Sequence, residues 1–333
     1  MDLWADFAGT PVIFWLGFLA LVAVLTAFDL GLLHRKNTEM GIAESLKLSA
    51  FYIGIAMLFG VWVWIKRGPE LGMAYYTGFF IEKALSIDNV FVISLIFTYF
   101  AIPRMYQYRA LLWGIIAVIV LRGIMIAAGA ALVQEYYWVL YIFAAFLIFT
   151  GVKMMFAGDQ EMDVARNPVV RFLSRHLNVT PQLHGEKFIV RVPDPKTGKL
   201  VRAVTPLFLA LVVINLADLV FAVDSVPAIF AITTDTFIVY TSNIMAILGL
   251  RALYFALAAM VHRFHYLKYA LAMVLVFIGS KIFVADFLLG GGKFPTSISL
   301  GVTFALILGG VLYSLWKTNK DDAAIAHSHP PTT

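Results

Sequence analysis

Long apolar segments follow one another along almost the whole chain, separated by short connections that contain most of the charged residues. A helix needs about 20 residues to cross the roughly 30 Å hydrocarbon core of a bilayer. Nine segments approach or exceed that length: residues 11–33, 47–65, 71–100, 110–133, 136–157, 204–231, 238–261, 266–289 and 296–317. The pattern predicts an all-α, polytopic membrane protein of about nine transmembrane helices, with the lipid bilayer as its first partner.

Composition supports this prediction. Hydrophobic residues make up 61% of the chain and charged residues 14%, and the mean hydropathy is +0.87, which exceeds what a soluble domain needs to fill one core. Cysteine is absent, so thiolate metal sites, disulfides and thiol redox chemistry of this chain are excluded. No basic residues precede the first apolar segment, so we expect it to remain as an anchor rather than to be cleaved as a leader.

The distribution of basic residues predicts the orientation, because cytoplasmic connections of membrane proteins are enriched in Lys and Arg. Alternate connections hold most of them: Arg35, Lys36, Lys47, Arg104, Arg109, the run from Arg166 to Arg202, Arg263, Lys268, Lys317 and Lys320. The other connections hold only Lys66, Arg67 and Lys293. We therefore expect the N-terminus outside and the C-terminus in the cytoplasm. The net charge of +5 reflects this topology. The sequence contains no basic patch with interleaved aromatic residues, so no nucleic-acid partner is expected.

An internal repeat relates residues 78–156 to residues 214–284. Its matched positions are Leu121, Arg122, Tyr141, Phe149, Gly151 and Lys153 in the first copy, and Leu250, Arg251, Tyr269, Phe277, Gly279 and Lys281 in the second. Each copy spans three helices, and an odd number turns the second copy upside down. We predict five parts: a two-helix segment at 1–70, the first three-helix repeat at 71–157, a cytoplasmic loop at 158–203, the inverted repeat at 204–289, and a ninth helix with a tail at 290–333.

Two polar segments lie outside the predicted membrane helices. The loop at 158–203 is expected to form a short helix after Pro168 and a hairpin from residues 187–192 and 199–203, without a core of its own. The tail from Asp321 to Thr333 is expected to be disordered, and its two histidines, His327 and His329, are weak evidence for a metal site.

The most informative feature is a pair of acidic motifs inside the apolar segments. Glu82 is followed six residues later by Asp88 and then Asn89, and Asp218 is followed in the same way by Asp224 and Ser225. An acidic residue at bilayer depth costs roughly 2.5–3.5 kcal/mol on insertion scales. Four of them in matched pairs predict a cation site with these ligands: Glu82, Asp88, Asn89, Asp218, Asp224 and Ser225. An all-oxygen set suits Mn²⁺, Mg²⁺ or Ca²⁺.

Helical geometry places Glu82, Ser86 and Asn89 on one face and Asp88 about 120° away, at roughly 100° per residue. Both carboxylates of one copy can reach one ion only if the helix is unwound near the motif. We therefore expect breaks in the two motif helices, and Pro227 favours a break in the second.

Basic residues at membrane depth are candidate charge-compensating or pathway groups: Lys83, Arg122, Lys153, Arg251 and Lys281. With them, the acids could exchange a metal ion for protons. The alternative is that the same groups form structural ion pairs that hold the helices together. Lys153 can also snorkel to the interface, and the same alternative applies to Lys281. Asp29 and Asp286 lie near span ends, where a surface or capping role is expected.

The motifs resemble those of the TerC family, in its Alx-like branch: Glu-Lys-Ala-Leu-Ser-Ile-Asp-Asn-Val-Phe-Val at 82–92, Asp-Leu-Val-Phe-Ala-Val-Asp-Ser-Val-Pro-Ala at 218–228, Phe-Thr-Gly-Val-Lys at 149–153 and Thr-Ser-Asn at 241–243. The resemblance extends from the first span to the ninth and implies Mn²⁺ efflux across the bacterial cytoplasmic membrane. Many members of the family have glutamate where this chain has Asn215. An amide can coordinate an ion but cannot carry a proton. The number of protons exchanged for each ion in a coupled transport cycle would therefore differ in this chain.

The leading hypothesis is a Mn²⁺ exporter without enzymatic activity or a prosthetic group, which binds the ion between Asp88, Asp224 and their partners at the interface of the inverted repeats. The alternative is a membrane partner in metal or tellurium stress resistance, or in metallation of exported proteins, that transports nothing itself. An intramembrane aspartyl protease is disfavoured because neither Asp88 nor Asp224 lies in a Gly-x-Gly-Asp sequence. The sequence contains no phosphate-binding loop, so an ATP-driven pump is disfavoured as well.

Overall fold

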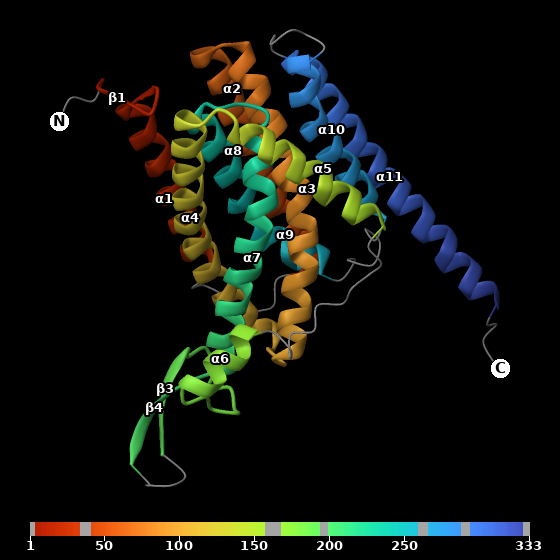
Figure 1. The fold of residues 1–333 in the computed structure, drawn as a ribbon. Coiled ribbons are helices and arrows are strands. Elements are labelled where there is room, and N and C mark those ends of the chain that lie inside the picture. Colours follow the sequence, from red (N-terminus) through yellow and green to blue (C-terminus); the bar gives the residue numbers. More distant parts are fainter. Residues whose placement is uncertain are drawn as a thin grey trace.

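The structure is a computed structural model that describes residues 4–33, 41–156, 168–193, 199–258, 266–287 and 294–328. Its long helices form one bundle (Figure 1). The helices are α1 (Val12–Leu33), α2 (Ile42–Arg67), α3 (Pro69–Tyr99), α4 (Arg104–Glu135), α5 (Val139–Phe156), α6 (Pro168–His176), α7 (Pro206–Phe230), α8 (Thr236–Leu248), α9 (Leu250–Leu257), α10 (Leu267–Phe287) and α11 (Thr296–Ser328). The strands are β1 (Asp6–Phe7), β2 (Thr10–Pro11), β3 (Ile189–Pro193) and β4 (Leu200–Val204).

Seven helices in the described part of the chain are long and apolar enough to cross a membrane, or eight if the bent pair α8–α9 counts as one span. A polytopic all-α membrane protein is thereby confirmed. Helix α3 is not among them because every 18-residue stretch of it contains at least three charged residues. The predicted total of nine spans requires both α3 and the bent pair to cross, and it stays a prediction.

The breaks predicted in the motif helices are wrong. Helix α3 runs without interruption through Glu82 and Asn89, and α7 continues past Asp218 and through Pro227. The break lies instead at Gly249, where α8 and α9 meet at 41°. The motif helices need no break, because the two carboxylates that meet, Glu82 and Asp218, come from different copies of the motif.

Helices α5 and α10 pack closely through two glycines. A Cβ atom on Gly151 would lie 2.7 Å from the carbonyl oxygen of Ala272, and one on Gly279 would lie 2.6 Å from that of Ala144. Neither space admits a side chain. The two contacts are reciprocal, since equivalent residues exchange roles, as a two-fold axis between the repeats requires. The inverted repeat itself stays a prediction.

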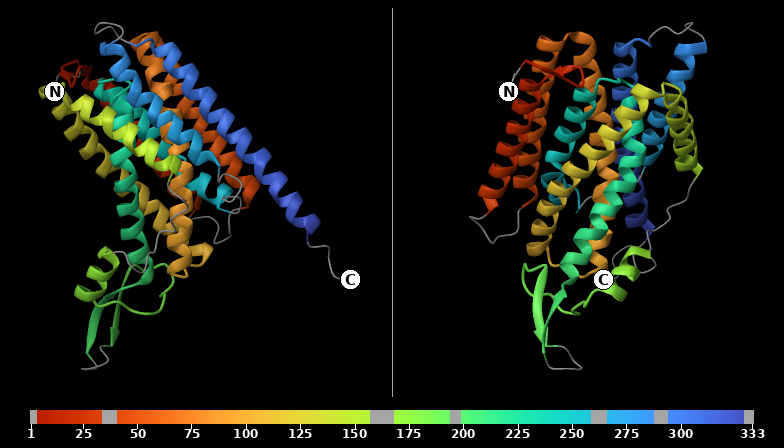
Figure 2. Two further views of the ribbon diagram at one scale, coloured as in Figure 1. Left: turned by 45° about the vertical axis from the view of Figure 1, so that its right-hand side comes forward. Right: turned by 60° about the vertical axis from the view of Figure 1, so that its left-hand side comes forward.

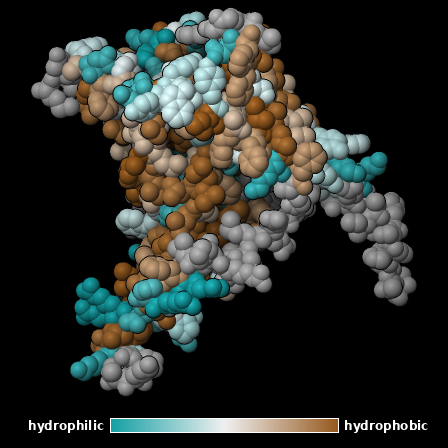
Figure 3. All heavy atoms as spheres, viewed as in Figure 1, coloured by the Kyte–Doolittle hydropathy of each residue, from teal (hydrophilic) through white to brown (hydrophobic). Residues whose placement is uncertain are grey.

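An appendage of α6, β3 and β4 projects from one end of the bundle, below the helix ends in the views of Figures 1 and 2. The strands pair antiparallel with Arg191 opposite Arg202, which confirms the predicted short helix and hairpin. Figure 3 shows hydrophobic side chains over the flank of the bundle and hydrophilic ones gathered on this appendage and at the opposite end.

Two terminal segments differ from expectation. Helix α11 continues to Ser328, so disorder from Asp321 onward is wrong for residues 321–328, where an alanine-rich sequence extends the last helix. Residues 329–333 lie outside the described part. At the other terminus, β1 and β2 form a small hairpin that the sequence did not predict, with Ala8 and Gly9 at positive φ in its turn.

Candidate functional site

Four helices bring polar side chains together in the middle of the bundle. Helix α3 packs against α7 and α8, and α4 packs against α7. The central residues are Glu82, Arg122 and Asp218, which are only 1%, 1% and 7% exposed. Asp218 lies halfway along α7, and Glu82 lies near the middle of α3. The groups therefore meet close to the midpoints of α3, α4 and α7.

Arg122 connects the two acidic motifs. Its Nε donates to Asp218 Oδ2 at 3.1 Å and its Nη2 donates to Asp218 Oδ1 at 3.0 Å, a bidentate pair. Its Nη1 donates to Glu82 Oε1, to Asn243 Oδ1 at 2.8 Å and to Ser225 Oγ at 3.2 Å. One guanidinium thus bridges a carboxylate from each predicted repeat.

Amide side chains complete the network. Asn243 Nδ2 donates to Glu82 Oε2 at 3.2 Å, and Asn89 Nδ2 donates to Asp218 Oδ1 at 3.3 Å. We call this set the Arg122 cluster; its members are Glu82, Asn89, Arg122, Asp218, Ser225 and Asn243. With both carboxylates ionised, one guanidinium against two acids leaves one formal negative charge, which is costly inside a bundle.

Two buried amide oxygens beside or within the cluster have no hydrogen-bond partner in the described part of the chain. They are Asn89 Oδ1 and Asn215 Oδ1. Asn215 precedes Asp218 by one turn of α7, and its Nδ2 donates to the carbonyl oxygen of Leu211 at 2.8 Å. A buried acceptor without a donor costs free energy, and such an oxygen is free to coordinate a cation.

The remaining acids of the motifs do not join this network. Asp224 is half-buried and accepts a hydrogen bond from Thr150 Oγ1 of α5 at 3.4 Å. Lys153, also on α5, interacts with it electrostatically and is itself exposed. The side chain of Asp88 lies outside the described part of the structure. The cluster therefore pairs Glu82 with Asp218, and the structure does not bring Asp224 to it.

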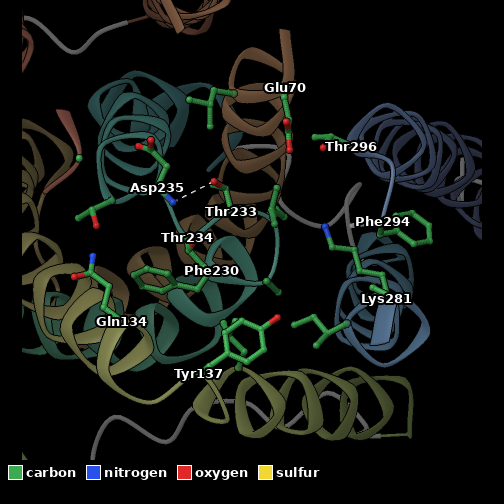
Figure 4. Close-up of a pocket in the computed structure, with 18 of the residues that line it drawn as sticks. Glu70, Gln134, Tyr137, Phe230, Thr233, Thr234, Asp235, Lys281, Phe294 and Thr296 are labelled. Atoms are coloured by element: carbon green, nitrogen blue, oxygen red, sulfur yellow. Dashed lines mark hydrogen bonds between the residues drawn. The ribbon is translucent and has the colours of Figure 1, made fainter. Parts of the chain in front are cut away.

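Of the five bases proposed as compensating groups, the structure brings only Arg122 into the cluster. Lys83 donates to the carbonyl oxygen of Ala246 at 3.0 Å, in the last turn of α8. Lys281 donates to Ser299 Oγ at 3.3 Å and lines a cavity of about 960 Å³ near the end of the bundle opposite the appendage (Figure 4). Counted along α7, that cavity begins roughly 18 Å from Asp218 at 1.5 Å per residue.

Arg251 lies in a separate buried pair. Its Nη2 donates to Asp29 of α1, and its guanidinium stacks over Tyr108, 4.6 Å from the ring centroid. Asp29 is 5% exposed, so the predicted surface or capping role is wrong. Burial at the end of α1 is possible because Arg251 supplies its counter-charge.

Asn243 is the residue of the cluster that sequence reasoning did not assign. The signal available was a run of three polar residues, Thr241, Ser242 and Asn243, inside an otherwise apolar helix. All three are fully buried. Over the residues that the structure describes, no group of three or more His, Asp or Glu side chains could hold a metal ion, and the guanidinium of Arg122 lies between the two acids of the cluster.

Comparisons with known proteins give a consistent picture. The family described as "Integral membrane protein TerC family" matches residues 67–322. An "Uncharacterized membrane protein" of Rickettsia felis is 48% identical over 92% of this chain and 99% of its own length. The "Putative membrane-bound redox modulator Alx" of Escherichia coli is 43% identical over 94% of this chain and 97% of its own. No solved structure matches the chain.

Proposed function

Since the chain belongs to the TerC family of integral membrane proteins, we propose that it is a secondary transporter that exports Mn²⁺ or a related divalent cation. The observation that carries the proposal is the Arg122 cluster, in which a buried carboxylate from each acidic motif meets at mid-bundle. Ionisable residues buried inside a membrane protein are candidates for a functional site. Sites of secondary transporters lie near the bilayer midplane, at the interface of repeats.

The donor set supports a hard or borderline divalent ion. Carboxylate oxygens of Glu82 and Asp218 and the free amide oxygens of Asn89 and Asn215 are the ligand types that Mn²⁺ and Mg²⁺ accept. Because the guanidinium of Arg122 lies between the two acids, an ion can bind only when Arg122 withdraws. We propose that cation and guanidinium alternate as counter-charges, so that the acids are never left uncompensated.

Proton coupling fits the same residues. Glu82 and Asp218 can release a cation by taking up protons, whereas Asn215 cannot carry one. Where relatives have glutamate at that position, one more titratable group is available. This chain would then move fewer protons for each ion than such a relative.

Transport into proteoliposomes tests the proposal. Purified protein is reconstituted, a pH gradient is imposed, and Mn²⁺ uptake is compared between wild type and Glu82→Gln. Glu186→Gln is the matched control, because Glu186 forms an exposed pair with Arg109 on the surface. We expect uptake to fall at least tenfold in Glu82→Gln and to stay unchanged in the control. Equal uptake by all three proteins would overturn the proposal.

A second candidate is a membrane partner that acts in metal or tellurium stress or in metallation without transporting ions. The exposed apolar side chains of the appendage, Phe172, Ile189 and Leu200, favour it. The relative named as a putative redox modulator is compatible with either role. This chain has no cysteine, so a redox role could not use thiols of its own. The candidate predicts that removing residues 168–204 abolishes function in cells while purified wild-type protein moves no ion.

A further inference from the structure

The cavity in Figure 4 has a polar lining that the proposed transport site does not use. It lies where four connections meet: β1–β2, α2–α3, α4–α5 and α7–α8, together with the ends of α10 and α11. Its volume of about 960 Å³ is in the range of pockets that hold small molecules. In Figure 4 the side chains of Glu70, Tyr137, Lys281 and Thr296 surround the open space.

Lys281 is a buried cation on the wall of this cavity. It is 7% exposed, and its single hydrogen bond within the described residues goes to Ser299 Oγ at 3.3 Å. An ammonium has three donors. No carboxylate lies within ion-pair distance of it in the residues that the structure describes, so its charge and two of its donors face the cavity unmatched.

Asp286 presents the opposite charge in the same cavity. It follows Lys281 by five residues on α10, roughly 7.5 Å along the helix axis. It accepts a hydrogen bond at Oδ2 from the neutral hydroxyl of Tyr141. Lys281 and Asp286 thus line one cavity without pairing with each other. Arg67 and Asp235, which also line it, neutralise each other at 2.6 Å.

Two charges of opposite sign that line one cavity without pairing with each other match a ligand that carries both charges. A simple anion would meet Lys281 but also the carboxylates of Asp286 and Glu70. A simple cation would meet Lys281. A zwitterion with an ammonium at one end and an oxyanion at the other satisfies both side chains.

The remaining wall narrows the ligand class. Leu71, Phe230, Ile282 and Phe294 give the cavity an apolar side, and the exposed aromatic residues Tyr136, Tyr137 and Trp138 lie at the same helix ends. Aromatic belts mark the headgroup level of a bilayer. A ligand that joins a zwitterionic head to an apolar body suits this position.

We propose that the cavity binds a phosphoethanolamine group, with its phosphate on Lys281 and its primary ammonium on Asp286. Tyr137 and Thr296 also line the cavity, and their hydroxyl groups can donate hydrogen bonds to the phosphate. The group could be the headgroup of a phospholipid or free phosphoethanolamine. Both sources share the chemistry, and the experiment separates them.

Native mass spectrometry of the full-length protein in detergent tests the site. Phosphatidylethanolamine or phosphatidylcholine is added at matched concentrations, and bound lipid is counted for wild type, Lys281→Met and Asp286→Asn. Lys153→Met is the control, since Lys153 matches Lys281 in the repeat but is exposed on the other helix. Elution as a single species in size-exclusion chromatography confirms that each variant is folded. Free phosphoethanolamine is titrated as a competitor.

Wild type and Lys153→Met are expected to prefer the ethanolamine lipid, because a primary ammonium donates hydrogen bonds that a quaternary one cannot. Lys281→Met should weaken binding of both lipids about tenfold or more. Asp286→Asn should abolish the preference but keep binding. Competition by free phosphoethanolamine supports a soluble source, and its failure supports the lipid. Equal binding of both lipids by wild type, or unchanged binding by Lys281→Met, would overturn the proposal.

Discussion

Arg122 and Arg251 hold matched positions in the predicted repeat, yet their surroundings differ. Arg122 bridges two carboxylates, one from each acidic motif, and donates to Ser225 and Asn243 as well. Arg251 has one carboxylate, Asp29 from a helix outside the repeat, and its Nε and Nη1 have no partner in the described residues. Equivalent bases have therefore diverged into a central counter-charge and a peripheral clamp.

The helices that carry the two arginines explain this difference. Arg122 lies within α4, an unbroken helix of 32 residues that packs against α7. Arg251 follows the 41° bend at Gly249, which directs α9 toward α2. The ammonium of Lys83, bonded to Ala246, lies beside that bend. Arg251, which follows this bend, lies apart from the Arg122 cluster, so that cluster has one guanidinium for two acids.

Removal of the arginines should give the largest effects. Arg122→Ala leaves two buried carboxylates without their ion-pair partner, and we expect it to destabilise the protein by about 3–5 kcal/mol. Arg251→Ala leaves a single buried carboxylate, Asp29, and we expect a smaller loss, at the lower end of that range. Thermal unfolding in one detergent measures both. Equal losses would contradict the distinction between counter-charge and clamp.

The effect of Mn²⁺ on the stability of the two variants also distinguishes Arg122 from Arg251. If cation and guanidinium are alternative counter-charges, Mn²⁺ should restore stability to Arg122→Ala by RT ln(1 + [L]/Kd), about 2.7 kcal/mol at a hundredfold excess over Kd. Arg251→Ala should gain no more than wild type. The unfolding temperature is followed as a function of Mn²⁺ concentration, with Na⁺ at matched ionic strength as the control. A Mn²⁺ response confined to Arg251→Ala would contradict the account.

A smaller effect tests the symmetry on which the comparison rests. Gly151→Ala and Gly279→Ala should each cost about 1–3 kcal/mol, because the added methyl group meets a backbone oxygen across the helix pair. Reciprocal contacts predict similar losses in thermal unfolding. Gly54→Ala on α2 is the control, since a Cβ there meets nothing within 4 Å. A loss in one of the two glycine variants alone would argue against a two-fold relation.

The fold could be predicted from the sequence where length and hydropathy decide it. The helix positions follow the apolar segments, and the hairpin of the appendage follows from Pro193 and the turn residues after it. Membrane insertion forces such segments into helices, so local sequence is sufficient. The helical spacing also placed Glu82, Ser86 and Asn89 on one face, and all three are buried in the structure.

The pairing of the acids could not be predicted in the same way. The acids of both motifs were expected to converge on one ion held between Asp88 and Asp224, which required broken helices, whereas the structure joins Glu82 to Asp218 across unbroken ones. The pairing of Arg251 with Asp29 could not be predicted either, because Asp29 belongs to a helix outside the predicted repeat. Such pairings depend on how helices pack, and spacing along the chain does not determine that.

The central claim is that the Arg122 cluster transports the ion, whereas the Arg251–Asp29 pair is a clamp. The most direct test compares Mn²⁺ flux in proteoliposomes that contain the Asp218→Asn or the Asp29→Asn variant, since each substitution removes one carboxylate from one of the two arginines. Protein incorporation and unfolding temperature are measured for both, so that a loss of flux can be separated from a loss of folded protein. We predict that Asp218→Asn abolishes flux while Asp29→Asn keeps a substantial part of the wild-type rate. Flux at the wild-type rate through Asp218→Asn would contradict the account.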